Sequence, residues 1–387
     1  MSIDEHVDVV VVGAGSTGAA AAAFLAEAGA RVIVVERRRL DEAGARWVNG
    51  VPLAAYREAG LEPPSAPELR GGPSPMYLTS PSGARVVIDG HEVVEIDMRH
   101  LVARLQARAR SAGARLVGET RVIEVTEDGV TTSAGVVRAR WIVDASGVAG
   151  ARLLGQPSPA REDLCAAAQE VREVRDPDAA RAFFAAHGVP AGGVLGMVGG
   201  AGGFSVVDVH LSHDAREISI LTGSLPALGF PSGKALLERF VAEHPWIGAT
   251  IFGGSGAIPL RRAYDRIASE RIALVGDAAC QVFPAHGSGV GSGMIAARLL
   301  ADTIASGRSL REYERAWQAR RGGLHATYDV LRRWNATLAP DQIERLLASG
   351  ALDPVLARAG LDQRLPELDV RALARQARAL AREPSLR

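Results

Sequence analysis

Residues 7–36 read VDVVVVGAGSTGAAAAAFLAEAGARVIVVE, and the fold class can be inferred from this stretch. Val7 to Val12 form an almost continuous β-branched run, which is typical of a strand buried on both faces of a parallel sheet. A glycine-rich turn follows, and the alanines after it predict a helix from about Thr17 to Ala28. The next apolar run, Arg31 to Val35, predicts a second strand that ends in Glu36. The order of strand, turn, helix and strand predicts an α/β fold with a parallel sheet.

Three glycines of the turn, Gly13, Gly15 and Gly18, have the GxGxxG spacing. In a dinucleotide-binding loop the first glycine permits a tight turn, the second lets the backbone approach a pyrophosphate, and the third lets helix and strand pack closely. The helix N-terminus offers free N–H groups and a partial positive charge to the phosphates. Glu36 follows 18 residues after Gly18, where a carboxylate accepts hydrogen bonds from a ribose hydroxyl. The predicted cofactor contacts in this region are Gly13, Ala14, Gly15, Ser16, Thr17, Gly18, Glu36 and Arg37.

An ordinary junction between a strand and a helix is the alternative to a nucleotide site, because GxGxxG alone is a weak signal. Here the motif follows a buried strand, opens a helix and precedes a second strand with a terminal acid. We therefore favour a dinucleotide site, with FAD and NAD both open at this point.

The composition excludes several classes of protein. The 387 residues are 47% hydrophobic and 23% charged, which indicates a globular chain. The 44 basic residues balance 44 acidic ones, so no basic excess indicates a nucleic-acid partner. Two cysteines are too few for a disulfide framework, the N-terminus lacks the basic start of a signal peptide, and no run of about 18 apolar residues predicts a membrane span. We expect a cytoplasmic protein.

A second glycine-rich region, residues 271–301, reads RIALVGDAACQVFPAHGSGVGSGMIAARLLA. A predicted strand, Ile272 to Val275, leads into Gly276-Asp277, and four alternating glycines from Gly287 to Gly293 then open a second long helix. An NAD dehydrogenase does not need a second helix N-terminus of this kind so far downstream, whereas a flavoprotein does. The second region therefore favours FAD.

Together these segments resemble the FAD-dependent superfamily that contains geranylgeranyl reductases, flavin-dependent aromatic hydroxylases and flavin halogenases. The resemblance implies that Asp277 binds the ribityl or pyrophosphate part of FAD and that Pro284 lies beside the isoalloxazine. It also implies that the second helix start points its dipole at the N1/O2 edge, where a reduced flavin carries negative charge. The cofactor contacts implied here are Gly276, Asp277, Pro284, Gly287, Gly289 and Val290.

Two more segments carry the resemblance. Residues 140–147, RWIVDASG, resemble the middle signature of the superfamily and imply FAD contacts at Asp144 and Gly147. Asp97 is the predicted N-cap of a helix whose Arg99 resembles an arginine that reaches the FAD phosphates, with a solvated helix arginine as the alternative. The signatures occur in the expected order between residues 7 and 301, about three quarters of the chain.

The resemblance implies a Rossmann-like FAD-binding domain of the glutathione-reductase type, an inserted antiparallel-sheet substrate domain and C-terminal helices. We predict a β-meander over residues 121–137, strands at 203–211 and 216–221, and helices at 179–186 and 234–242. A basic amphipathic helix at 370–382 either packs on the domain surface or contacts a membrane surface or lipid substrate. The predicted domains are 1–75, 94–160 and 256–330 for FAD, 76–93 and 161–255 for the substrate, and 331–387 as a C-terminal helical segment.

The reaction type is less evident. Asn49 replaces the cysteine that geranylgeranyl reductases carry beside the flavin, and their tyrosine–tryptophan substrate motif is not evident. Halogenation is disfavoured, because the chain has a single lysine, Lys234, and no WxWxIP motif. We favour a reductase that passes hydride to an activated double bond. The alternatives are a monooxygenase that uses a C4a-hydroperoxide and a non-catalytic flavin-binding or ligand-carrying protein.

The substrate is expected to be a small, largely apolar or aromatic molecule, and the electron donor to be NAD(P)H, docking transiently, or another external donor. The predicted catalytic residues are His286, Asn49 and Arg261, with Tyr264 also lining the pocket. His286 follows Pro284 beside the expected isoalloxazine and could act as general acid or base near neutral pH, or merely fill space in the loop. No metal site is predicted, because His210 and His213 lack a third ligand.

Overall fold

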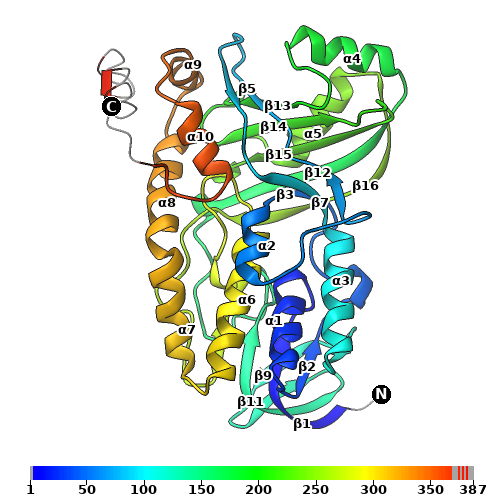
Figure 1. Cartoon of the computed structure of the whole chain (residues 1–387), viewed down its shortest axis with the longest axis vertical. Helices are drawn as coiled ribbons and strands as arrows, with labels where there is room; N and C mark the ends of the chain where they lie inside the picture. Colours follow the sequence, from blue (N-terminus) through cyan, green and yellow to red (C-terminus); the bar gives the residue numbers. More distant parts are fainter. Residues whose placement is uncertain (1–2, 368–373, 375–376, 379–380, 382–387) are drawn as a thin grey trace. The chain divides into compact units, whose positions relative to one another are not determined.

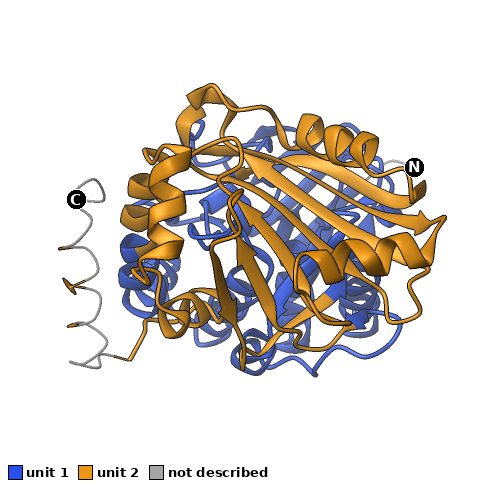
Figure 2. Ribbon diagram, turned by 90° about the horizontal axis from the view of Figure 1, so that it is seen from above, with its two compact units in different colours: residues 1–70, 96–159, 259–327 blue, residues 71–95, 160–258, 328–387 orange. Residues whose placement is uncertain are grey.

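The computed structural model describes residues 3–367, 374, 377–378 and 381 of the chain (Figure 1). The predicted amphipathic helix at 370–382 falls largely outside the described residues. The chain divides into two compact units, each assembled from separated segments (Figure 2). Unit 1 comprises residues 1–70, 96–159 and 259–327, and unit 2 comprises residues 71–95, 160–258 and 328–387. Residues 331–367, the continuously described part of the predicted C-terminal segment 331–387, fall in unit 2 in this division.

Unit 1 is built on a seven-stranded sheet of β1 (Ile3–Val12), β2 (Val32–Val35), β8 (Arg115–Val117), β9 (Val122–Val125), β10 (Gly129–Thr132), β11 (Gly135–Asp144) and β17 (Ile272–Leu274). The order is β8-β2-β1-β11-β10-β9, and β17 also pairs with β11. β1 lies between β2 and β11 and is parallel to both. Val9, Val10 and Val11 are fully buried, which confirms the predicted central strand. β9, β10 and β11 are antiparallel and form the predicted meander.

The helices of unit 1 include α1 (Ser16–Glu27), α2 (Leu53–Ala59), α3 (Met98–Ser111), α6 (Val290–Ala305) and α7 (Leu310–Trp317). α1 packs against both α3 and α6 (Figure 1). Its alanines, Ala19 to Ala23, are all buried, because small side chains let the neighbouring helices approach closely. Asp97 accepts a hydrogen bond from the Arg99 N–H at 3.0 Å, which confirms the predicted cap of α3.

Three short strands, β3 (Val48–Pro52), β4 (Leu69–Gly71) and β7 (Val93–Asp97), form a small sheet in the order β3-β7-β4. After α7, a π-helical turn at Gln318–Gly322 leads into α8 (Gly323–Ala336). Within the described residues, no helix combines the length and the apolar character that crossing a bilayer requires.

Unit 2 contains a second seven-stranded sheet of β5 (Met76–Thr79), β6 (Arg85–Ile88), β12 (Leu164–Val174), β13 (Val194–Val198), β14 (Ser205–Leu211), β15 (Glu217–Ser224) and β16 (Ile247–Pro259). The order is β16-β12-β15-β14-β13-β5-β6. The β13–β14, β14–β15 and β12–β15 pairs are antiparallel, whereas β5 is parallel to β13. The predicted antiparallel sheet is thus confirmed, with one parallel pair inside it.

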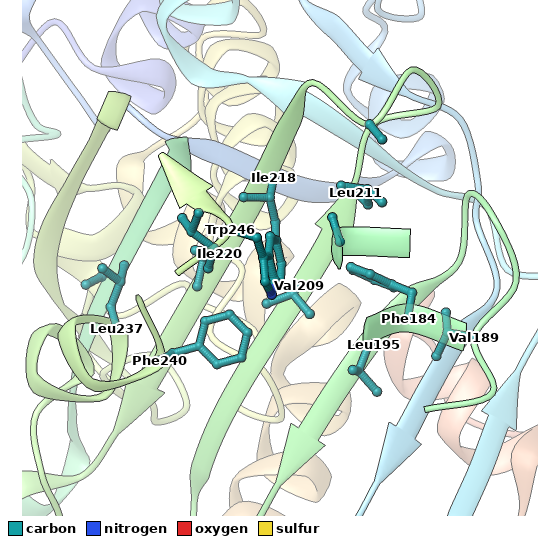
Figure 3. Close-up of a cluster of buried hydrophobic side chains, with 14 residues drawn as sticks. Phe184, Val189, Leu195, Val209, Leu211, Ile218, Ile220, Leu237, Phe240 and Trp246 are labelled. Atoms are coloured by element: carbon teal, nitrogen blue, oxygen red, sulfur yellow. The ribbon is translucent and has the colours of Figure 1, made fainter. Parts of the chain in front are cut away.

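One face of the unit 2 sheet is covered by α4 (Pro177–Ala186) and α5 (Gly233–Glu243), the two helices predicted in this region. Figure 3 shows the core between them, where Phe240 of α5 lies beside Val209 of β14 and Ile220 of β15. A second cluster joins β6 to α9 (Pro340–Ala348) through Val86, Ile343 and other apolar side chains, with α10 (Pro354–Leu361) packed nearby. Side chains on β14 alternate between the two sheet faces, so only every second residue of this strand enters the helix-covered core.

Candidate functional site

The loop between β1 and α1 is packed tightly against backbone. Gly13 has a φ of +105°, and its N–H donates to the Val35 carbonyl at 2.8 Å. A Cβ on Gly13 would lie 2.4 Å from the Ala145 carbonyl oxygen, and a Cβ on Gly18 would lie 2.0 Å from the Gly13 carbonyl oxygen. Because backbone cannot yield as a flexible side chain does, both positions require glycine. The α1 N-terminus, capped by Gly15 without a side-chain acceptor, consequently opens directly onto this loop.

Glu36 is buried at the end of β2 and bonded to the same loop. One carboxylate oxygen accepts the N–H of Ala14 at 2.9 Å and the other accepts the N–H of Arg38 at 3.0 Å. Arg37, which follows the acid, is exposed. A carboxylate has about four acceptor positions, so Glu36 retains capacity for hydroxyl donors beyond the two backbone groups.

Sequence reasoning missed two residues that hold this loop in place. Gln106 of α3 donates from its Nε2 to the carbonyls of Ala14, at 3.0 Å, and Leu40, at 2.9 Å. Gly44 lies so close that a Cβ on Gly15 would be 3.2 Å from its Cα. A signal existed for Gln106, because it is a polar residue on the apolar face of a helix. Its partner Ala14, however, is 92 positions away in the sequence.

Asp144 and Gly147 lie where β11 ends beside β1. The buried Asp144 carboxylate accepts the Ser146 N–H on Oδ1 at 3.1 Å and the Leu153 N–H on Oδ2 at 2.9 Å. Asp144 therefore shapes the turn that follows β11. Gly147 has a φ of +83°, and a Cβ built on it would meet nothing within 4 Å.

The second glycine-rich region meets the first at Thr17. A Cβ on Gly293 would lie 2.1 Å from Thr17 Oγ1, and a Cβ on Gly276 would lie 2.8 Å from the same atom. Thr17 is in the first turn of α1, and Gly293 is in the first turn of α6. The structure thus brings the N-termini of α1 and α6 together within unit 1. The two glycine-rich regions that carry them, residues 7–36 and 271–301, are far apart in the sequence.

Asp277 lies where the two helix starts meet, and its carboxylate lacks a hydrogen-bond donor among the described residues. Its Oδ1 would be 2.9 Å from a Cβ on Gly289, so the absence of a side chain at Gly289 makes room for it. Within the described part of the chain, no group donates a hydrogen bond to this half-buried carboxylate. Burial raises the pKa of Asp277 to about 6, because desolvation penalises the charged form. An acid with this environment is suited to hydroxyl groups of a bound molecule.

A buried hydrogen-bond chain that sequence reasoning also missed supports the Gly276 turn. The Gly276 N–H donates to Gln281 Oε1 at 2.8 Å, and Gln281 Nε2 donates to the Tyr313 hydroxyl oxygen at 2.9 Å. The Tyr313 hydroxyl donates in turn to the Leu274 carbonyl at 2.9 Å. These hydrogen bonds link β17, the Gly276 turn and α7, and so they hold Asp277 in position.

The loop that carries His286 lies against β3. Pro284 is buried, whereas His286 is exposed and accepts the Ser288 N–H on Nδ1 at 3.3 Å. Ser288 Oγ donates to the Gly50 carbonyl at 3.1 Å, next to Asn49, which is half-buried. The structure therefore brings the segments of two predicted catalytic residues, His286 and Asn49, side by side.

Arg261 and Arg99 have different surroundings. The Arg261 guanidinium lies 4.7 Å from the Tyr264 ring centroid, and the Tyr264 hydroxyl donates to the Pro157 carbonyl at 2.6 Å. The Arg99 guanidinium, 31% exposed, makes a two-point ion pair with Asp97 at 3.0 and 2.6 Å. Each arginine thus has a local partner.

Comparisons with known proteins agree with this geometry. The model of the family described as FAD dependent oxidoreductase matches residues 8–70. Digeranylgeranylglycerophospholipid reductase 1 of Methanopyrus kandleri is 29% identical over 342 residues, covering 80% of this chain and 86% of the relative. The digeranylgeranylglycerophospholipid reductase of Methanothrix thermoacetophila is 29% identical over 371 residues, covering 88% and 90%.

Solved structures share the fold. A geranylgeranyl bacteriochlorophyll reductase-like protein from Thermoplasma acidophilum has a TM-score of 0.74 at 20% identity, covering 99% of this chain and 100% of the other. P. aeruginosa PqsL in complex with 2-aminobenzoylacetate has a TM-score of 0.64 at 19% identity, covering 90% and 100%. Together with the paired helix starts, these findings show that the chain is similar to FAD-dependent oxidoreductases and shares the mixed α/β fold of the geranylgeranyl reductase-like structure.

Proposed function

We propose that this chain is an FAD-dependent reductase that saturates carbon–carbon double bonds of geranylgeranyl lipids. The observation that carries the proposal is the similarity to digeranylgeranylglycerophospholipid reductases, which extends from 29% identity over 80% of this chain to 24% over 89% of it. The similarity covers segments of both units, so it is not confined to the nucleotide loop. An apolar isoprenoid lipid also agrees with the apolar substrate that the sequence predicts.

In this proposal the Gly13–Gly18 loop and the N-terminus of α1 hold the FAD pyrophosphate, and Glu36 accepts hydrogen bonds from the ribose. The proposal is supported by the glycine positions, which allow the tight turn because side chains there would meet backbone, and by the spare acceptor capacity of the Glu36 carboxylate. Bound FAD supplies the hydride chemistry of the reaction. Arg37 remains a predicted contact at this end of the cofactor.

The N-terminus of α6 is proposed to face the flavin. Asp277 would hold ribityl hydroxyls, which would satisfy its half-buried carboxylate, and Gly276 and Pro284 would border the ring system. The helix start at Gly287, Gly289 and Val290 would favour the negative charge of the reduced cofactor. His286 and Asn49 are proposed to line the substrate side, with Arg261 and Tyr264 farther along the same unit.

Three residues predicted to contact FAD could not do so through free side-chain groups in the arrangement described. Arg99 would have to exchange part of its Asp97 pair for a phosphate. Asp144 and Gly147 would act through the turn that they shape beside Gly13, because both Asp144 oxygens already accept backbone N–H groups. The electron donor is proposed to be NAD(P)H or another external donor that docks transiently, since the GxGxxG loop is assigned to FAD.

The test is anaerobic. Protein loaded with FAD is reduced with NADH, NADPH or dithionite and then mixed with an unsaturated digeranylgeranyl glycerophospholipid or with its fully saturated counterpart as the control. We expect the flavin absorbance to return only with the unsaturated lipid, and mass spectrometry to show two added hydrogens per reduced double bond.

Other outcomes would contradict the proposal in distinct ways. If the reduced protein and the lipid are afterwards exposed to labelled O2, incorporation of the label into a product would instead identify a monooxygenase. Bound FAD that no donor bleaches would identify a non-catalytic flavin-binding protein. Failure to take up FAD would remove the cofactor assignment itself.

A further inference from the structure

A cavity of about 440 Å³ lies within unit 2, on the face of the sheet that α4 and α5 cover. Its floor is one row of side chains across three strands, because the register pairs Thr79 of β5 with Met197 of β13, and Met197 with Val207 of β14. Met197 and Val207 pack against the core beneath the helices, and Thr79 shares their side of the sheet because paired residues point the same way. The volume is within the range of small-molecule sites, roughly 300–1,000 Å³.

The walls of the cavity repeat one arrangement on the two helices. α4 presents Phe183 and, at its C-cap, His187, and α5 presents Phe240 and, at its C-cap, His244. Each imidazole lies against the phenylalanine of its own helix, with ring centroids 4.4 and 4.2 Å apart, and its Nδ1 is 2.9 or 2.6 Å from the carbonyl oxygen of that phenylalanine. A carbonyl oxygen only accepts, so Nδ1 carries the proton and the Nε2 of each neutral ring is an acceptor. The two walls are therefore aromatic, with acceptors in the rings of the histidines.

The hydroxyl of Thr79 is the polar group of the floor row. Thr79 is only 9% exposed, and among the residues that the structure describes its Oγ1 has no hydrogen-bond partner. A buried hydroxyl without a partner costs free energy, which a group that supplies the missing hydrogen bond restores. Thr222 of β15, in the same sheet, is the contrasting case, because its hydroxyl is bonded to the Ala168 and Gly233 carbonyls at 3.1 and 2.7 Å. The floor of the cavity thus has one unsatisfied polar group in an apolar row.

The charges along the cavity cancel. Arg239 and Glu243 lie one turn apart on α5, with Arg239 Nε 3.9 Å from Glu243 Oε1, and their side chains are 60% and 61% exposed. Within the described lining, no other arginine, lysine, aspartate or glutamate occurs. Exposed groups of this kind are screened by water and contribute little to binding a counter-charge. A charged ligand would therefore lose its hydration without a buried partner of opposite sign, and a neutral ligand is favoured.

We propose that this cavity binds a small neutral alcohol, an apolar molecule of about 10–15 non-hydrogen atoms with one hydroxyl group. At the roughly 30 Å³ that a water-sized group occupies in a liquid, a molecule of this size fills the volume. Its hydroxyl pairs with the hydroxyl of Thr79, since each can both donate and accept, and its apolar body lies along Met197 and Val207. The site belongs to unit 2 alone, and it depends neither on FAD nor on the proposed reductase function.

Calorimetric titration of the purified full chain with 1-decanol, decanoate and decylammonium tests the assignment. The three probes are saturated, so none offers a double bond to a reductase. We expect 1-decanol to bind at one site and the two charged probes to bind at least about tenfold more weakly. Val207→Phe fills part of the cavity from its floor and should weaken 1-decanol binding at least about tenfold. Thr250→Val, at an exposed threonine of β16, is the matched control and should bind 1-decanol as the unmutated protein does.

Thr79→Val separates ligand binding from stability. The substitution replaces the hydroxyl by a methyl group of similar size, so it should weaken 1-decanol binding about three- to tenfold without lowering the urea midpoint of the free protein. Thr222→Val removes a bonded hydroxyl and should lower that midpoint. Unchanged 1-decanol affinity in either Val207→Phe or Thr79→Val, or equal affinity for the charged probes, would overturn the assignment. Each of these results leaves the reductase function untouched, because no measurement uses turnover.

Discussion

Helices α1 and α6 both begin at glycine-rich loops of unit 1, but the two loops require glycine for different reasons. At the α1 loop, side chains on Gly13 and Gly18 would meet backbone carbonyls at 2.4 and 2.0 Å. At the α6 loop, a side chain on Gly293 would meet the Thr17 hydroxyl at 2.1 Å. The backbone carbonyls at the α1 loop are held in place by the sheet, whereas the Thr17 side chain that crowds the α6 loop can be shortened by substitution. The first loop therefore tolerates change less than the second.

The acidic residues beside the two loops differ in how well their carboxylates are hydrogen-bonded. Glu36 beside the α1 loop accepts two backbone N–H groups, so it stabilises the protein without a ligand. Asp277 beside the α6 loop accepts no hydrogen bond within the described residues, and its burial costs free energy until a ligand supplies donors. The comparison indicates that the acid of the α1 loop is satisfied in the folded chain, whereas the acid of the α6 loop is the one that the proposed cofactor would satisfy.

The largest effect is expected for Gly18→Ala, because its Cβ would overlap the Gly13 carbonyl oxygen. We expect a loss of about 3 kcal/mol or more in the free energy of unfolding, or no soluble protein at all. Gly15→Ala is the matched variant, since its nearest contact is Gly44 Cα at 3.2 Å. It should lose less stability than Gly18→Ala but bind FAD at least about tenfold more weakly, because the backbone loses its close approach to the pyrophosphate. Urea unfolding and FAD titration measure both effects, and equal stability of the two variants would contradict the claim that the backbone contact at Gly18 is what makes glycine necessary there.

A smaller effect is expected at the α6 loop. Gly293→Ala should destabilise the FAD-free protein by about 1–3 kcal/mol through its overlap with Thr17 Oγ1. Thr17→Ala removes that atom, so the double variant should recover most of the loss, and alanine also favours the helix over glycine. A double-mutant cycle in urea measures the coupling between the two sites. Strictly additive losses would show that Thr17 is not the constraint.

The smallest effect on the free energy of unfolding is expected for substitutions of the two acids, and its sign is opposite at the two loops. The pKa of Asp277 in the folded protein is about 6, above its ordinary 3.8. Between these pH values the folded state holds a proton that the unfolded state has released, so this residue makes stability fall as pH rises. Asp277→Asn should therefore match the unmutated FAD-free protein near pH 4 and be about 1–2 kcal/mol more stable near pH 7, while binding FAD more weakly.

Glu36→Gln provides the contrast. A glutamine amide has one accepting oxygen in place of two, so one of the N–H groups of Ala14 and Arg38 would lose its partner, at about 1 kcal/mol. The two variants are compared by thermal unfolding across this pH range. Stabilisation by both substitutions, or by neither, would show that the acids do not differ as described.

The sequence is a good guide to the local elements of this protein. The β-branched runs predict β1 and β2, the alanine-rich segment predicts α1, and Asp97 predicts the start of α3, all of which the structure confirms. Such signals are local, because strand periodicity, helix propensity and capping depend on residues within one or two turns. The GxGxxG motif is likewise contiguous, and this explains why the superfamily could be inferred before any geometry.

The surroundings of the candidate site residues were not predictable in the same way. Gln106 reaches Ala14 across 92 positions, and Gly293 meets Thr17 across a still longer separation. No local pattern marks these contacts, because they arise only when the helices pack against one another. Arg99 shows the reverse case, since its partner Asp97 is two residues away and the motif gave no sign of that pair.

The secondary-structure elements, the helix cap and the resemblance to the superfamily can thus be inferred from the amino-acid sequence, since each depends on residues that are neighbours in it. The surroundings of the Glu36 and Asp277 carboxyls cannot. Glu36 follows a strand and Asp277 lies in a turn, and nothing in the flanking residues distinguishes a satisfied acid from an unsatisfied one. Only strand register and helix packing place two N–H groups on Glu36 and Gly289 beside Asp277. Desolvation and hydrogen bonding are properties of the assembled environment, so the chemistry of these acids emerges with the tertiary structure.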